Sequence, residues 1–251
     1  MRDLRAARDL FTETWGRGTR VVLVHGSLAT GSDEWQAQRS LADHGFELVV
    51  FDRRGYGRSP SAEGEDFRRD GEDIAGLMGN GAHLVGHSYG GLGVMCAAAS
   101  RPEATLSVTL LEPGAFSLGQ NHPAARALVT EIRNLWTQEL PDEEWVLRFL
   151  QAVGSDPDTL SAELIASAVT LTPVLRRGRA PFESGLPLAA LAAAAYPKLV
   201  VSGGHSLGWD AICADVAEQI GGSRLEIAGA GHEVQFAGQP LNDVLLRLWK
   251  P

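Results

Sequence analysis

The chain has 251 residues, of which 44% are hydrophobic and 21% are charged, and its formal net charge at pH 7 is −9. This size and composition are typical of one large globular domain, and the acidic balance argues against a nucleic-acid partner because no Lys/Arg cluster offsets it. The sequence has neither the apolar segment of a signal peptide near its start nor a run of the ~18 apolar residues that a membrane span needs, so we expect a cytoplasmic protein without a membrane partner.

Short apolar runs alternate with helix-compatible stretches along the chain. A weakly alternating segment at 8–15 is a candidate edge strand, and the later runs are continuously apolar, as expected for strands buried on both faces. These runs occupy residues 20–24, 47–51, 83–85, 107–111, 198–201 and 224–227. The helix-compatible stretches between and after them are 35–44, 67–79, 92–101, 188–195, 210–220 and 241–249. This alternation predicts an α/β protein with a mostly parallel sheet and helices on both faces.

Residues 116–184 break the alternation because they contain no apolar run of the buried-strand type. Three stretches within them have a helix-compatible pattern instead: 124–136, 143–153 and 161–171. In open α/β sheets, ligands bind at the carboxyl edge of the strands, where an insertion of this kind can cover them. We therefore predict a core formed by residues 1–115 and 185–251, with residues 116–184 as a helical cap.

A serine between two glycines stands at one predicted strand-to-helix junction. Residues 86–90 read Gly-His-Ser-Tyr-Gly, directly after the apolar run 82–85. A turn this tight leaves no room for flanking side chains, and it holds the serine in strained backbone angles that project its hydroxyl above the sheet. Ser88 is therefore the candidate nucleophile, and the dipole of the following helix would favour an oxyanion beside it. His87, the variable residue of the pattern, is expected to have a packing role.

A serine hydroxyl is a poor nucleophile near neutral pH, so it needs an adjacent base, and that base needs an orienting group. The candidate base is His232, which ends the glycine-rich segment 228–232 just after the last predicted strand. A lone histidine on a loop is more commonly a surface residue. Here the loop follows the final strand, and the serine motif precedes it in the chain, which favours a catalytic role for His232.

Acyl transfer also needs hydrogen-bond donors that face the tetrahedral oxyanion. The backbone N–H of Tyr89, directly after Ser88, is one candidate. The second is expected from the loop 25–28 after the first buried strand, where Ser27 or, less favourably, Leu28 would present its N–H. The alternative interpretation of this loop is a simple turn that ends the strand.

Four segments together resemble the α/β-hydrolase fold family over nearly the full length of the chain. They are His25-Gly26, the nine residues Phe-Asp-Arg-Arg-Gly-Tyr-Gly-Arg-Ser at 51–59, the pattern at 86–90, and Gly231-His232. The resemblance implies a Ser-His-acid triad, in which the serine attacks a carbonyl carbon and the acyl-enzyme is then hydrolysed. It also implies that the segment 52–59 is a structural turn, so no catalytic role is assigned to Asp52, Arg53 or Arg54.

The acid of the triad is where the sequence departs from the family pattern. Most members carry an Asp about four residues beyond the strand that corresponds to 198–201, and this chain has Ser206 there. Glu112 is the preferred candidate, because some members, haloalkane dehalogenase-like ones among them, carry the acid at the end of the preceding strand. A buried carboxylate there also needs a partner, such as a histidine N–H. Asp210 is the alternative, although an Asp at that place also suits the N-terminus of a helix; a chain without a functional acid is the third alternative.

Large aromatic residues are the candidates for the substrate pocket. Trp35, Phe116 and Trp209 follow predicted strand ends. Trp136 belongs to the apolar set at helical spacing in the predicted cap, most of which we interpret as helix-packing residues. An apolar cap on an acidic chain favours a neutral or hydrophobic small molecule as the substrate.

These features favour a serine hydrolase that cleaves a small carboxylic ester or lactone. A carbon–carbon bond hydrolase, a lyase or a cofactor-free oxygenation enzyme on the same triad is one alternative, and a catalytically silent small-ligand binding protein of this fold is another. A dehalogenase or an epoxide hydrolase would need an Asp in place of Ser88. The sequence has neither a metal-ligand cluster nor a phosphate-binding loop, and Cys96 and Cys213 are interpreted as buried free thiols, so we expect no cofactor. The sequence does not indicate an oligomeric state.

Overall fold

The computed structural model describes residues 9–155, 157–183 and 185–250. Its centre is a seven-stranded sheet with the strand order β1-β3-β2-β4-β5-β6-β7. The pairs from β3 to β7 are parallel, and only β1 runs antiparallel to its neighbour β3. The strands span Thr12–Gly16 (β1), Thr19–Val24 (β2), Phe46–Phe51 (β3), Ala82–His87 (β4), Thr105–Leu111 (β5), Lys198–Ser202 (β6) and Ser223–Glu226 (β7). The predicted α/β class is thereby confirmed.

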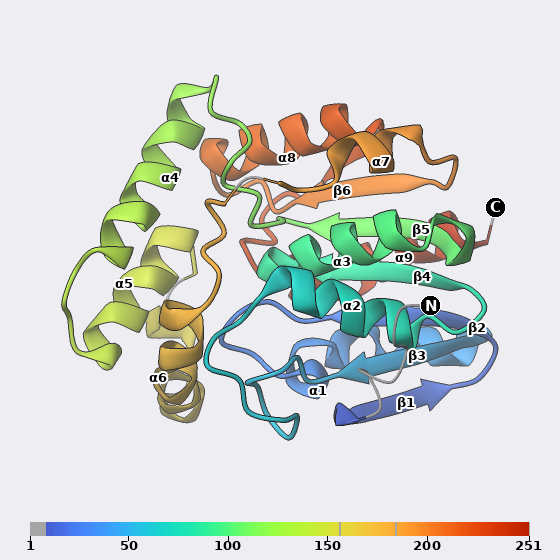
Figure 1. The fold of residues 1–251 in the computed structure, drawn as a ribbon, viewed down its shortest axis with the longest axis horizontal. Helices are drawn as coiled ribbons and strands as arrows, with labels where there is room; N and C mark the ends of the chain where they lie inside the picture. Colours follow the sequence, from blue (N-terminus) through green and yellow to red (C-terminus); the bar gives the residue numbers. More distant parts are fainter. Residues whose placement is uncertain (1–8, 156, 184, 251) are drawn as a thin grey trace.

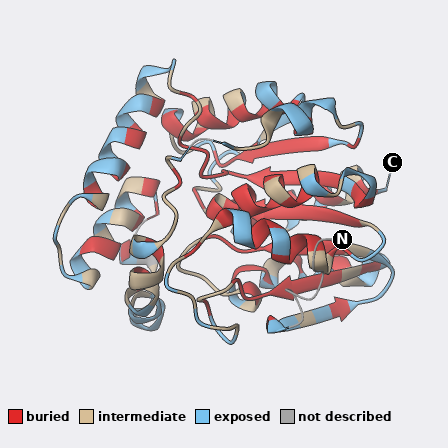
Figure 2. Cartoon of the chain, viewed as in Figure 1, coloured by how far each residue is buried: buried red, intermediate tan, exposed pale blue. Residues whose placement is uncertain are grey.

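Helices cover both faces of the sheet (Figure 1). One core cluster joins α2, α3, α7 and α8 to the sheet, and a second joins η2 and α9 to its other face. The elements of the core are α1 (Gly31–Glu34), η2 (Gln36–His44), α2 (Phe67–Leu77), α3 (Ser88–Ser100), η3 (Pro102–Ala104), α7 (Leu188–Ala193), α8 (Leu207–Ile220), η5 (Val234–Ala237) and α9 (Gln239–Trp249). The central strands are buried along most of their length, as Figure 2 shows, because helices screen both faces.

The predicted helix at 35–44 is wrong in type. The structure has the four-residue α1 before it and the 3₁₀ helix η2 over Gln36–His44. The break lies at Trp35, whose backbone leaves the helical region (φ −104°, ψ 13°) and whose ring is fully buried in the core. The hydrophobic pattern could not distinguish these two helix types, because both bury one side of a short segment.

The insertion between β5 and β6 forms three α-helices: α4 (Pro123–Trp136), α5 (Asp142–Val153) and α6 (Ala162–Arg177), with the short η4 (Pro157–Thr159) after α5. In Figure 1 the arrowheads of the parallel strands point toward these helices. They have a small core of their own, which includes Leu135, Trp145, Val146 and Leu175. We call α4 to α6 the cap; its predicted last residue, 184, lies outside the described residues.

Of the helices in the described part of the chain, none combines the length and the apolar composition that a bilayer crossing requires.

Candidate active site

Ser88 stands at the junction of β4 and α3, in the left-handed backbone region with φ 49°. The two glycines of the pattern are required by close packing. A Cβ on Gly90 would lie 2.4 Å from the carbonyl oxygen of His25, and one on Gly86 would lie 2.8 Å from Val94. This crowding fixes the turn, which directs the hydroxyl of Ser88 away from the sheet.

The structure brings Ser88, His232 and Glu112 together. Nε2 of His232 lies 3.2 Å from Oγ of Ser88, and Nδ1 of His232 lies 2.8 Å from Oε2 of Glu112. All three lie beyond the carboxyl ends of the strands, which is why residues so distant in the chain can meet. An imidazole protonated on Nδ1 satisfies both contacts, because it then donates to the carboxylate and accepts from the hydroxyl.

Glu112 is fully buried and has φ 37°, an unusual value for a non-glycine residue. Its Oε1 accepts a hydrogen bond of 2.7 Å from the backbone N–H of Gly203. Burial acts to raise the pKa of Glu112, but interactions with His205 and His232 outweigh it and hold the pKa below its usual value. The carboxylate is therefore ionised at neutral pH.

Asp210 does not reach His232. Its Oδ1 accepts from the hydroxyl of Ser202 at 2.7 Å and pairs with Arg224 at 2.8 Å. The helix α8 begins three residues earlier than predicted and is capped by Ser206, whose hydroxyl accepts from the backbone N–H of Trp209. Asp210 thus lies in the first turn of α8 and ties it to the edge of the sheet.

The candidate oxyanion donors, Ser27 and Tyr89, line the same cavity as Ser88. Tyr89 lies in the first turn of α3, where backbone N–H groups have no partner within the helix. The hydroxyl of Ser27 donates to the carboxylate of Glu65, with 2.9 Å to each oxygen. Leu28 has φ 66° and packs against the small core of the cap, so its side chain belongs to the cap contact.

A buried charge cluster supports the loop that carries Ser27. The guanidinium of Arg53 is fully buried and donates to the carbonyl oxygens of His25 and Gly26. It also pairs with Glu65 at 2.9 Å and with Asp70 at 2.8 Å. The sequence placed Arg53 in a structural turn but gave no hint of Glu65, because the segment around Glu65 is polar and has no periodic pattern. The only sequence signal for Glu65 was indirect: an Arg in a turn after a core strand needs a carboxylate partner if the guanidinium becomes buried.

His87 links the two loops that flank Ser88. Its Nδ1 lies 3.1 Å from Oε1 of Glu34, and its Nε2 lies 3.1 Å from the carbonyl oxygen of His232. Glu34 in turn accepts from the backbone N–H of Gly26. Burial acts to lower the pKa of His87, but the carboxylate of Glu34 outweighs it and raises the pKa above the usual value. The residue is buried, as its predicted packing role requires, and through Glu34 it also connects the loop that carries Ser27 with the loop that carries His232.

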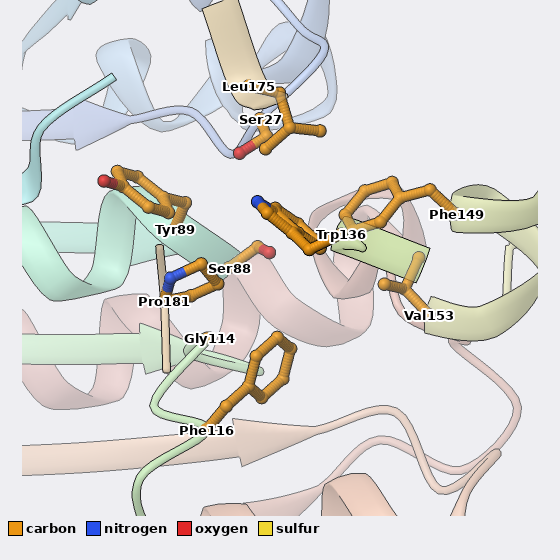
Figure 3. A pocket seen from close by; sticks show the side chains of 10 residues that line it. All are labelled: Ser27, Ser88, Tyr89, Gly114, Phe116, Trp136, Phe149, Val153, Leu175 and Pro181. Atoms are coloured by element: carbon orange, nitrogen blue, oxygen red, sulfur yellow. The ribbon is translucent and has the colours of Figure 1, made fainter. Parts of the chain in front are cut away.

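A narrow cavity of about 280 Å³, part of it open to solvent, lies between Ser88 and the cap. Its lining is mostly apolar, as the close-up in Figure 3 shows. The lining residues are Ser27, Ser88, Tyr89, Gly114, Phe116, Trp136, Phe149, Val153, Leu175 and Pro181. The ring nitrogen of Trp136 points into this space, is shielded from solvent, and has no hydrogen-bond partner among the described residues.

Two predicted pocket residues lie elsewhere. Trp35 is fully buried in the core cluster on the η2–α9 face of the sheet, so it supports the fold and does not line the cavity. Trp209 stands behind the lining, where its ring stacks on His232 with 4.5 Å between ring centroids and lies 5.3 Å from that of Phe116. Phe116 and Trp136 do line the cavity.

Within the described residues, no group of three or more His, Cys, Asp or Glu side chains is arranged to hold a metal ion. Cys96 and Cys213 are both free, and burial raises the pKa of the Cys96 thiol to about 11. A thiol with such a pKa is a weak nucleophile near neutral pH.

Comparison with known proteins gives a family model, described as the alpha/beta hydrolase family, that matches residues 21–244. A bifunctional esterase/perhydrolase of Acinetobacter calcoaceticus is 38% identical over 90 residues, which are 33% of this chain and 33% of that protein. A pimeloyl-[acyl-carrier protein] methyl ester esterase of Aeromonas salmonicida (strain A449) is 31% identical over 150 residues, 57% of this chain and 58% of that protein. The chain thus spans about a third to somewhat over half of the length of these curated relatives.

Solved structures match over a greater length. A thermophilic esterase from Thermogutta terrifontis has a TM-score of 0.69 and 22% identity, with 96% of this chain and 94% of that chain covered. A putative aryl esterase from Burkholderia cenocepacia has a TM-score of 0.70 and 19% identity, with 96% of both chains covered. Similarity at this level of identity establishes the fold.

Proposed function

Because the chain belongs to the alpha/beta hydrolase family, we propose that it is a serine hydrolase that cleaves a carboxylic ester or lactone of a small, largely apolar molecule. The observation that carries the proposal is the continuous contact from the hydroxyl of Ser88 through His232 to the buried carboxylate of Glu112. Such a chain of contacts turns a weakly nucleophilic hydroxyl into an effective one.

In the first step, Oγ of Ser88 attacks the carbonyl carbon while Nε2 of His232 takes the hydroxyl proton. The ring becomes an imidazolium, which the carboxylate of Glu112 stabilises through the 2.8 Å contact. The carbonyl oxygen gains negative charge in the tetrahedral intermediate. Backbone N–H groups of Ser27 and Tyr89 would donate to it, and the N-terminus of α3 adds its dipole.

In the second step, His232 gives its proton to the leaving alcohol, and the acyl group stays on Ser88. Water then attacks the acyl-enzyme with His232 as the general base, which releases the acid and restores the serine. For a lactone, the alcohol and acid parts of the product remain joined. The reaction uses only water as its second substrate.

The cavity supports the choice of substrate class. Its walls are aromatic and aliphatic side chains of the core and the cap, among them Phe116, Phe149 and Leu175. The cavity is narrow and part of it is open to solvent, so a short acyl group fits better than a long chain. Two of the relatives are named as an esterase/perhydrolase and as a pimeloyl-[acyl-carrier protein] methyl ester esterase, and both names agree with ester chemistry.

Labelling with a fluorophosphonate probe tests the proposal. We expect one probe per chain, attached to Ser88, and no label on the S88A variant. Hydrolysis of short-chain p-nitrophenyl esters against a panel of lactones then separates the two substrate classes. A wild-type protein that folds but takes no label would contradict the proposal and favour a ligand-binding role. Labelling without hydrolysis of any ester or lactone would favour carbon–carbon bond cleavage or another reaction on the same triad.

A further inference from the structure

The end of the cap helix α5 is fastened to the core at residues 153–155. The carbonyl oxygen of Val153 accepts a 2.8 Å hydrogen bond from the indole N–H of Trp209, and Nε2 of His205 lies 3.3 Å from the same oxygen. The hydroxyl of Ser155 donates to the carboxylate of Glu233. The side chain of Val153 also lines the cavity, so these contacts hold part of the pocket wall.

Each core partner of this segment also adjoins the residues of the proposed triad. The ring of Trp209 stacks on that of His232, and Glu233 follows His232 in the chain. Nδ1 of His205 lies 3.4 Å from Oε1 of Glu112, which is ion-pair distance although the two groups are not aligned for a hydrogen bond. His205 is thus the one of these partners that faces the catalytic carboxylate with one nitrogen and the cap with the other.

The surroundings of His205 call for two ring protons. Its Nε2 faces a carbonyl oxygen and its Nδ1 faces a carboxylate oxygen, and neither of these groups can donate. A neutral imidazole has one N–H, so one of its nitrogens would present a lone pair to an acceptor. An imidazolium avoids this lone-pair contact, and its positive charge lies at ion-pair distance from the carboxylate of Glu112.

The charged groups near His205 agree with this state. The interaction with Glu112 is the main cause that raises the pKa of His205 above its usual value; partial burial opposes the shift, and Glu233 adds to it. The ring of His232 is a further titratable group nearby, with 6.5 Å between the two ring centroids. The packing on the cap side is tight, since a Cβ on Gly154 would lie 2.4 Å from Nε2 of His205.

We propose that His205 is a positioning residue that, as an imidazolium, joins the end of the cap to the catalytic carboxylate. By holding the carbonyl of Val153 and the carboxylate of Glu112 together, it sets the pocket wall and the acid in their working positions at the same time. This inference rests on the proposed function, because it assigns the role of acid to Glu112.

The role has a consequence for pH dependence. When His205 loses its proton, one of its two contacts becomes a contact between a lone pair and an acceptor, and the cap end loses its link to the acid. Relative to a variant that lacks the His205 ring, kcat/KM of the wild type therefore falls as the pH rises through the raised pKa of His205. It reaches a lower plateau that corresponds to the unlinked cap.

The test compares His205→Gln with the wild type and with His44→Gln, in which an exposed histidine of η2 is replaced. Glutamine keeps a donor near the place of Nε2 but carries no charge and no proton for Glu112. kcat/KM for a short p-nitrophenyl ester, and the rate of inactivation by the fluorophosphonate, are measured from about pH 6 to about pH 10. We expect H205Q to be about tenfold slower than wild type below the pKa of His205 and equal to it on the alkaline plateau.

Convergence at high pH distinguishes the proposal from a merely structural role, which would lower the rate by the same factor at every pH. A constant ratio, or an H205Q profile that coincides with those of wild type and H44Q, would overturn the inference. Since the wild type is labelled at Ser88 in either case, such a result leaves the proposed function intact. Absence of label on the wild type would instead contradict the proposed function.

Two further measurements keep the test decisive if H205Q is poorly folded. The ¹⁵N shifts of the His205 ring in the wild type at neutral pH should report two protonated nitrogens, and a singly protonated ring would refute the proposal. Gly154→Ala pushes a methyl group onto His205 from the cap side. We expect its effect on kcat/KM to be smaller in the H205Q background than in the wild type, because the link is already lost there.

Discussion

Glu112 directly follows the buried strand β5, and its surroundings could be predicted from the sequence only in part. Its position at the end of a buried strand indicated that a carboxylate there needs a partner. The structure gives it three neighbours: the imidazole of His232, the backbone N–H of Gly203 and the ring of His205. Only the first was expected, because the other two depend on how the loop after β6 folds back over the strand end.

Replacing the carboxylate should abolish most of the activity without unfolding the protein. We expect Glu112→Gln to lower kcat by about 10³- to 10⁴-fold, because the amide no longer stabilises the imidazolium and favours the wrong tautomer of His232. Asp210→Asn should stay within a few-fold of wild type, because Asp210 contacts Ser202 and Arg224 and not the histidine. Steady-state kinetics of both purified variants checks this, and a reversed order would assign the acid to Asp210.

Trp136 offers a donor to the substrate. Its indole N–H points into an otherwise apolar cavity and lacks a partner among the described residues, so it should favour a substrate with a matching acceptor. Methoxyacetate and butyrate esters of p-nitrophenol differ by one oxygen in place of a methylene. We expect Trp136→Phe to lower the methoxyacetate-to-butyrate ratio of kcat/KM by about 5- to 10-fold relative to wild type. Comparing the ratio between two enzymes cancels the intrinsic reactivity of the esters, and an unchanged ratio would show that the N–H does not contact the acyl group.

The candidate site could be predicted from the sequence where a residue has a strict backbone context. Ser88 and His232 stand at strand ends with glycines around them, and the sequence alone placed both at one edge of the sheet. Trp35 was misplaced because the end of a strand does not reveal to which face of the sheet the next residue turns. His205 was missed because its partners come from β5 and α5, which no local pattern connects to it.

At the scale of elements, close packing constrains the glycines around Ser88. We expect Gly90→Ala to destabilise the protein by more than about 2 kcal/mol, because its Cβ would lie 2.4 Å from the carbonyl oxygen of His25. Gly81→Ala is the matched control. A Cβ at this position would meet atoms no closer than 3.6 Å, and Gly81 directly precedes β4, the strand that leads into the turn at Ser88. Urea denaturation of the two variants should give a large loss for the first and a change within about 0.5 kcal/mol for the second. Equal losses would mean that the turn is not limited by this contact.

Helix ends were predicted less well than helix positions. The pattern ended the third cap helix at 171, but α6 continues through Pro173 to Arg177. Proline removes one backbone donor from a helix. The residues Thr172 and Leu175, before and after Pro173 in the sequence, are buried, and their packing stabilises the helix across the proline. Tertiary packing therefore overrode the local signal at Pro173. At α8 the predicted start was late because the local cap at Ser206 was not recognised.

At the scale of the whole molecule, one buried histidine far from the active site should weaken the fold in acid. His83 on β4 contacts the hydroxyl of Ser107 and stacks on Trp249, and burial lowers its pKa to about 4. The unfolded chain takes up a proton near pH 6.5, whereas the folded protein does so only near pH 4. Its stabilising contribution is thus present above pH 6.5 and is lost as the pH falls toward 4, by at most about 3 kcal/mol.

His83→Asn isolates this contribution, because asparagine keeps a polar atom near Ser107 but does not titrate. The free energies of unfolding of wild type and H83N are compared in urea at pH 7 and at about pH 4.5. We expect the wild-type value to fall more steeply than that of the variant between the two pH values. Parallel changes would show that His83 is protonated in the folded state as easily as in the unfolded chain.

Among the described residues, the non-glycine residues with left-handed backbones are Leu28, Ser88 and Glu112, and they follow the ends of three adjacent parallel strands. Each such conformation costs roughly 1–3 kcal/mol relative to a relaxed backbone. These three conformations therefore lower the thermal stability of the protein below the value that the same fold would have with relaxed backbones. Selection for thermal endurance alone should drift toward glycine or asparagine at these three places. At Leu28, whose side chain contacts the cap and not the triad, the change in turnover would measure how much that backbone conformation contributes to the reaction.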